Sequence, residues 1–87
     1  MEAFQQRWHR ITELEGEALV QVRGKRFTFS VHGNMLTPST TNRNLPRSSF
    51  ETAYARLPVD GPGELQDLQG PSYLYAILTD GRVLETR

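Results

Sequence analysis

The chain has 87 residues, no cysteine and a formal net charge of zero, with 37% hydrophobic and 23% charged residues. This length suits one domain, which we expect to span residues 1–87. Without cysteine, disulfides and thiolate zinc sites are excluded, and no apolar run approaches the ~20 residues of a membrane helix. We therefore expect a cytoplasmic protein that needs no cofactor and has no membrane partner.

Residues 1–14 have the spacing of an amphipathic helix. Phe4, Trp8 and Ile11 recur at intervals of four and three residues, which places them on one apolar stripe. Trp8 could stack on a nucleobase, but its position on the stripe favours packing in the core. Gly16 is the residue type that commonly ends a helix, and it follows this stretch directly.

An alternation of period two over residues 18–33 predicts strands. Val20 and Val22 alternate with polar residues, and a second run continues the same period. Aromatic and β-branched residues with this period are typical of strands that bury one face. The residues expected to point into the core are Val20, Val22, Phe27, Phe29 and Val31.

Two turn signals divide this segment into a meander. Residues 23–26 contain the glycine that a tight hairpin needs, and Gly33 with Asn34 can supply the positive φ angles of a second turn. Residues 35–37 then form a short third strand, which Pro38 ends. The prediction is an antiparallel β-meander with one apolar face and one polar face.

The middle of the chain predicts a loop followed by a helix. Residues 39–46 are polar and lack periodicity, which indicates a loop. Ser48 and Glu51 have the spacing of a capping box, in which the serine accepts a bond from the third helical amide. Pro58 is expected to end this helix, because proline cannot continue the hydrogen-bond ladder. The expected inner stripe comprises Phe50, Ala53, Tyr54 and Leu57.

The C-terminal part predicts short helices. A helical turn is expected over residues 64–69. Residues 72–86 fit two structures. One is a helix capped by Ser72 and closed by Gly81, and the other is a hairpin whose strands, residues 75–78 and 83–86, are joined by a turn at residues 80–81. We favour the helix, because Gly-Pro-Ser is a good signal for a helix start.

The order of these elements indicates the fold class. A helix comes first, the strands follow, and short helices come last, without any internal repeat. We therefore predict an α+β fold, with a small antiparallel β-meander and with the N-terminal helix and short C-terminal helices packed on one face.

Three segments resemble parts of small bacterial domains. They are Gly-Lys-Arg-Phe-Thr at residues 24–28, RNLPRSSFETA at residues 43–53 and GPSYLYAILTDGRV at residues 70–83. Such domains pair a β-hairpin that begins near the first element with a helix start like the second, and the resemblance covers roughly residues 14–83. It implies an association with bacterial DNA-handling and restriction-type systems, and it assigns no catalytic residue.

Basic charge is concentrated in one third of the chain. Residues 18–50 contain five basic residues and no Asp or Glu, which gives a local charge of +5. Arginine and lysine bind phosphate, and the amides at the helix start near Ser48 would favour an anion. The alternative is that these charges only keep a hairpin tip and a loop solvated. The candidate nucleic-acid-binding residues are Arg23, Lys25, Arg26, Asn42, Arg43, Arg47 and Ser48.

The leading hypothesis is a non-enzymatic module that contacts the phosphates of DNA or RNA. The rival is a protein–protein interaction or homodimerisation module that uses an exposed strand edge or a tyrosine surface. Basic residues that converge beside a helix N-terminus would favour the first hypothesis, and scattered ones would favour the second. His9 and His32 lack the spacing of metal ligands, and Glu13, Glu15 and Glu17 occupy predicted element ends, so none of them indicates catalysis.

Overall fold

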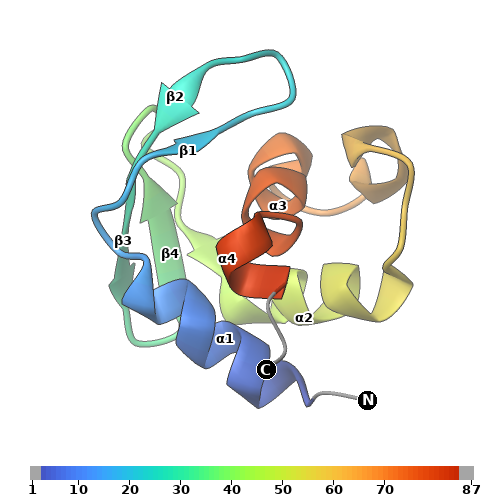
Figure 1. Cartoon of the computed structure of the whole chain (residues 1–87), viewed down its shortest axis with the longest axis horizontal. Coiled ribbons are helices and arrows are strands. Elements are labelled where there is room, and N and C mark those ends of the chain that lie inside the picture. Colours follow the sequence, from blue (N-terminus) through green and yellow to red (C-terminus); the bar gives the residue numbers. More distant parts are fainter. Residues whose placement is uncertain (1–2, 85–87) are drawn as a thin grey trace.

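The computed structural model describes residues 3–84 and shows helices gathered beside two small sheets (Figure 1). The elements are α1 (Phe4–Glu13), β1 (Leu19–Val20), β2 (Arg26–Phe27), β3 (Phe29–His32), β4 (Met35–Pro38), β5 (Leu45–Pro46), α2 (Arg47–Arg56), the 3-10 helix η1 (Pro62–Leu65), α3 (Pro71–Leu78) and α4 (Gly81–Leu84). This order confirms the predicted α+β class. No helix within residues 3–84 is long and apolar enough to cross a membrane.

The strands form two antiparallel sheets. One contains β1 and β2, and the other has the order β3-β4-β5. Thr28 separates β2 from β3, so the predicted meander divides at this residue. The segment predicted to be a loop ends instead in β5, where Leu45 pairs with Leu36. The loop prediction fails there because Leu45 is fully buried, which a single leucine in a polar stretch does not reveal.

The first strand buries the face opposite to the one predicted. Leu19 pairs with Phe27, so these two side chains share the buried face. Alternation then turns Val20 outward, and Val22 lies beyond β1 in the turn. Their side chains are 53% and 61% exposed, so the prediction that both point into the core is wrong. Phe27 and Phe29 are buried as predicted, and Val31 packs partly against the core.

An aromatic cluster joins α1 to α2. Phe4, Trp8 and Ile11 are buried, as the helical stripe predicted. The Trp8 ring lies 5.4 Å from the Phe50 ring between centroids, which confirms that this tryptophan belongs to the core. Gly16 follows the helix with a φ of +87°, in agreement with the predicted stop. Residues 1 and 2 of the predicted helix lie outside the described residues.

The helix α2 forms as predicted, but the capping box does not. Pro46, in an extended conformation at φ −73° and ψ 149°, takes the N-cap position, and no side chain caps the helix. Ser48 therefore lies inside the first turn, where its hydroxyl cannot cap that turn. The first helical amide, of Arg47, donates instead to the Asn34 carbonyl at 2.7 Å. The helix ends two residues before Pro58, as predicted.

The helix α3 starts at a glycine and not at the predicted serine. Gly70 is the N-cap in a left-handed conformation, with φ 63° and ψ 52°. Its carbonyl accepts the amides of Tyr73 and Leu74, at 3.0 and 2.9 Å. Ser72 makes no cap hydrogen bond, because Pro71 occupies the first helical position and places the serine second.

The helix alternative for this segment is confirmed and the hairpin is wrong within the described residues. Residues 75–78 belong to α3, whereas residues 85 and 86 of the hairpin alternative lie outside the described part. Gly81 opens α4 and does not close α3. The end of α3 is marked by Thr79, whose hydroxyl donates to the Tyr75 carbonyl at 2.6 Å.

The first and last described helices are neighbours. The side chain of Arg10 in α1 donates from Nε to the Val83 carbonyl of α4 at 3.0 Å. Val83 itself is fully buried. The helices α1 and α4, at the two ends of the described chain, therefore lie side by side against the core.

An ion pair joins α2 to the turn that follows η1. The helical turn predicted at residues 64–69 forms slightly earlier, as η1, and Leu65 is fully buried. Arg56 donates from Nη1 and Nη2 to the two carboxylate oxygens of Asp67, each at 2.7 Å. These hydrogen bonds hold the pKa of Asp67 at about 2, below its usual 3.8.

We expect this pair to stabilise the fold except in strong acid. Because the pKa of Asp67 is lower in the folded chain, its contribution is present above about pH 4 and is lost as the pH falls towards about 2. Asp67→Asn should therefore have a lower urea midpoint than the parent at about pH 6, and the difference should fade between about pH 4 and about pH 2.

Asp60→Asn is the matched control, since the Asp60 carboxylate makes no hydrogen bond or ion pair with any residue from 3 to 84. A difference for Asp67→Asn that stays constant over this pH range would show that the ion pair does not stabilise the fold.

Candidate functional site

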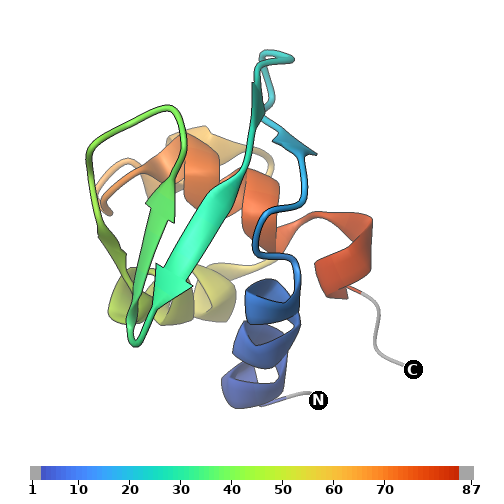
Figure 2. The same ribbon diagram turned by 90° about the vertical axis from the view of Figure 1, so that its left-hand side faces the viewer.

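Four of the predicted basic residues lie on two loops at one end of the molecule. Arg23, Lys25 and Arg26 belong to the β1–β2 hairpin, and Arg43 belongs to the loop after β4. In both Figure 1 and Figure 2 these loops lie at the end away from α1. We call this set, Arg23, Lys25, Arg26 and Arg43, the basic end.

Hydrogen bonds hold the two loops together. The Ser39 amide donates to the Thr28 carbonyl at 2.8 Å, and the Thr28 amide donates to Ser39 Oγ at 3.0 Å. Tyr73 of α3 contacts both loops, with its ring 5.1 Å from the Phe27 ring and its hydroxyl hydrogen-bonded to that of Thr40. Through Tyr73, the helix α3 therefore contacts both the β1–β2 hairpin and the loop after β4.

The charges of the basic end are not neutralised locally. All four side chains are exposed, and none of them forms a hydrogen bond or an ion pair within residues 3–84. Other arginines differ in this respect, because Arg56 pairs with Asp67 and Arg82 pairs with Asp80 at 2.9 Å. The basic end therefore presents a local positive field on a chain whose net charge is zero.

Arg47 and Ser48 lie elsewhere. The strand β5 runs antiparallel to β4 and carries the chain back towards the Asn34 turn before α2 begins. The Arg47 guanidinium lies over Phe4 and Trp8, 5.4 and 5.8 Å from their ring centroids. The start of α2 and the hairpin cations do not form one surface, so the basic residues do not converge beside a helix N-terminus, the arrangement that was expected to favour nucleic-acid binding. Asn42, an exposed neighbour of Arg43, lies in the loop after β4.

A hollow of about 300 Å³ opens beside the hairpin. Three segments that are far apart in the sequence form it, namely the β1–β2 turn, the η1 region and the start of α3. The lining residues are Gln21, Val22, Arg23, Pro62, Gln66, Pro71 and Ser72. Apart from Arg23, no sequence pattern marked them as site residues, because only the fold brings these segments together.

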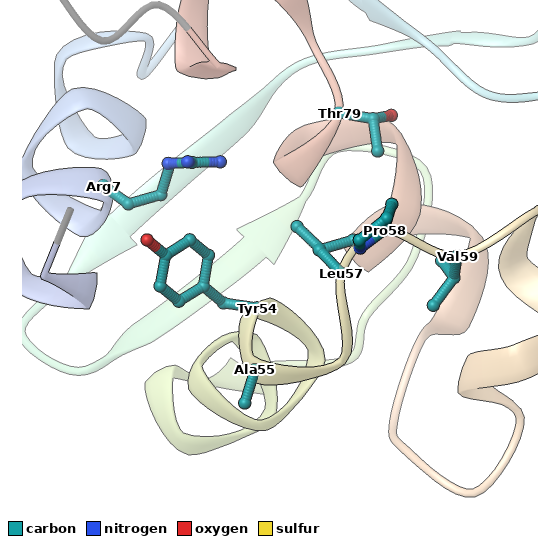
Figure 3. Close-up of a pocket in the computed structure, with 7 residues that line it drawn as sticks. All are labelled: Arg7, Tyr54, Ala55, Leu57, Pro58, Val59 and Thr79. Carbon is teal, nitrogen blue, oxygen red and sulfur yellow. The ribbon is translucent and has the colours of Figure 1, made fainter. Parts of the chain in front are cut away.

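A second pocket, of about 420 Å³, lies between α1, the end of α2 and Thr79 (Figure 3). Arg7 reaches over the Tyr54 ring, 4.7 Å from its centroid, and is only 7% exposed. The remaining wall is mostly apolar and includes Leu57 and Val59. The burial of Arg7 was not predicted, although Arg7 lies three residues after Phe4 and so borders the apolar stripe.

The acidic and histidine side chains of residues 3–84 do not form a metal-binding cluster. Within residues 3–84, no three of the His, Cys, Asp and Glu residues are placed to hold a metal ion. His9 lies 3.3 Å from Glu13 on the same helix, and Glu15 accepts the Val31 amide at 2.9 Å. Neither of the two pockets described above has a carboxylate or a histidine among its lining residues.

Comparison with known proteins gives no match. No protein-family model matches the chain, and neither does any curated protein or any solved structure. The chemistry and placement of its own side chains are therefore what support a function.

Proposed function

We propose that this chain is a non-enzymatic nucleic-acid-binding module that contacts phosphates through Arg23, Lys25, Arg26 and Arg43. The observation that supports this function is the basic end, four exposed cations on two joined loops without a local counter-charge. Lysine and arginine contacts to phosphate provide most of the affinity of such modules. Asn42, in the same loop, adds an amide donor for the phosphate or the sugar.

The proposal changes the predicted site in one respect. Arg47 and Ser48 are left out, because Arg47 packs on Phe4 and Trp8 and the helix start faces the Asn34 turn. The absence of cysteine and the resemblance to bacterial domains support a role in the bacterial cytoplasm, in a system that handles DNA.

Binding to labelled DNA and RNA strands and duplexes, followed by fluorescence anisotropy, tests this function. Four phosphate contacts predict that affinity falls about 50-fold for a single strand, and about 150-fold for a duplex, between about 50 and 200 mM salt. Replacing all four basic residues by glutamine should abolish measurable binding and remove this salt dependence.

The matched control keeps the positive charge and changes only the shape of the charged group, from a guanidinium to an ammonium. Arg23→Lys, Arg26→Lys and Arg43→Lys in one chain should retain most of the affinity and the salt dependence, because each ammonium still neutralises a phosphate. If the parent binds no nucleic acid at about 50 mM salt, the proposal is refuted. If the lysine and glutamine variants lost the same affinity for nucleic acid, the positive charge of these side chains would not be the cause of binding.

One observation favours homodimerisation as a second candidate function. Val20 and Val22 are exposed and line a hollow of about 280 Å³ together with Tyr75. Within residues 3–84, β1 pairs with no strand other than β2, so a strand from a second copy could pair with it beside the Ala18 carbonyl, which accepts a hydrogen bond from Arg82 at 3.1 Å. Light scattering that reports a monomer at all concentrations would exclude this alternative.

A further inference from the structure

We propose that the hollow lined by Gln21, Val22, Arg23, Pro62, Gln66, Pro71 and Ser72 receives one unstacked nucleobase. The ligand class is then single-stranded nucleic acid, since a base inside a duplex is stacked and paired and cannot enter. This inference rests on the proposed function and narrows it, because phosphate contacts alone do not distinguish strands from duplexes.

The size and the apolar walls of the hollow suit a flat ring. Its volume of about 300 Å³ lies at the lower limit of small-molecule sites. Pro62 comes from η1 and Pro71 from the start of α3, while Val22 comes from the hairpin turn. Rigid proline rings and a branched aliphatic side chain can cover the faces of a base without loss of much conformational freedom.

The polar groups of the hollow suit the edge of a base. Gln21 and Gln66 each carry an amide that both donates and accepts, and Ser72 carries a hydroxyl that does the same. None of these three side chains forms a hydrogen bond within the described residues. They are therefore available for a base edge, which presents donors and acceptors side by side.

Arg23 connects the hollow to the basic end. It lines the hollow and also belongs to the four unpaired cations, so a base in the hollow would place its own phosphate near the hairpin. Of the acids near Gln66, Asp67 is paired with Arg56, which offsets its charge. Glu64 accepts the Asp60 amide at 2.7 Å and keeps its negative charge, so Arg23 is the charged group of the hollow that attracts a phosphate.

Three probes of equal length separate base binding from phosphate binding. They are a labelled twelve-nucleotide DNA strand, the same strand paired with its complement, and a twelve-residue strand that lacks all bases. At about 150 mM salt the parent should bind the strand with bases about tenfold more tightly than either other probe. Gln21→Ala with Gln66→Ala should reduce this preference to near unity without changing the salt dependence.

Gln5→Ala with Gln69→Ala is the matched control, because both glutamines are exposed and neither lines the hollow. This variant should keep the tenfold preference. Equal affinity of the parent for the strands with and without bases would overturn the base site while leaving the phosphate-binding function intact. Absence of binding to all three probes would overturn both.

Discussion

Truncating Phe50 to alanine is expected to lower the free energy of unfolding by about 3–5 kcal/mol. The Phe50 side chain is fully buried in α2, and its ring packs on Trp8 of α1 at 5.4 Å between centroids. Alanine would leave a cavity between these helices, and the lost aromatic contact adds to the cost. A domain of this size has a total stability of about 4–13 kcal/mol, so the variant loses a large part of it.

Urea unfolding followed by tryptophan fluorescence measures this loss directly, since Trp8 is the single tryptophan and lies in the cluster. Phe50→Leu keeps most of the volume and should cost about 1–2 kcal/mol, which keeps the test informative if the alanine variant does not fold. Thr52→Ala, at an exposed position of the same helix, should change stability by less than about 0.5 kcal/mol. A loss below about 1 kcal/mol for Phe50→Ala would contradict the packing described.

The second large effect is expected at Gly70, where alanine should cost about 2–4 kcal/mol. The residue has a φ of +63°, which alone disfavours a side chain by about 1–2 kcal/mol. A Cβ atom there would also lie 2.8 Å from Leu45 Cδ2. Leu45 is fully buried, so its side chain has no free space into which it could move.

Gly24→Ala separates the cost of the positive φ angle from the cost of the contact with Leu45. Gly24 has a φ of +89°, but a Cβ atom there meets nothing within 4 Å, so only the backbone term of about 1–2 kcal/mol should remain. Gly70→Ala combined with Leu45→Ala should cost less than the sum of the two single changes, because the smaller side chain makes room. Equal costs at Gly24 and Gly70 would show that the contact with Leu45 does not matter.

The positions of α1, α2 and α3 were predicted because an apolar stripe is a local signal, whereas the capping residues of α2 and α3 and the separate helix α4 were not. The stripe of Phe4, Trp8 and Ile11 needs only the period of a helix, and so does the stripe of α2. The strands show the limit of this reasoning, since an alternation defines two faces but not which one is buried. Leu19 pairs with Phe27, and this shift of one residue placed Val20 in solvent.

The placement of the candidate site's residues was predicted in part. Charge composition identified the exposed cations of the hairpin and Arg43, because such residues seldom leave solvent. It misjudged Arg47, whose guanidinium lies on two aromatic rings supplied by α1. The hollow was not predicted, since Gln21 and Gln66 are neutral, unpatterned and 45 residues apart (66 − 21), and only the fold makes them neighbours.

The contact between α1 and α4 has a consequence for how the protein is made. Arg10 leaves the ribosome 73 residues ahead of its carbonyl partner, Val83. A nascent chain that ends before residue 83 lacks the buried Val83 side chain and the helix α4, which contacts α1. During synthesis, the contact between α1 and α4 therefore forms only after residue 83 has emerged from the ribosome.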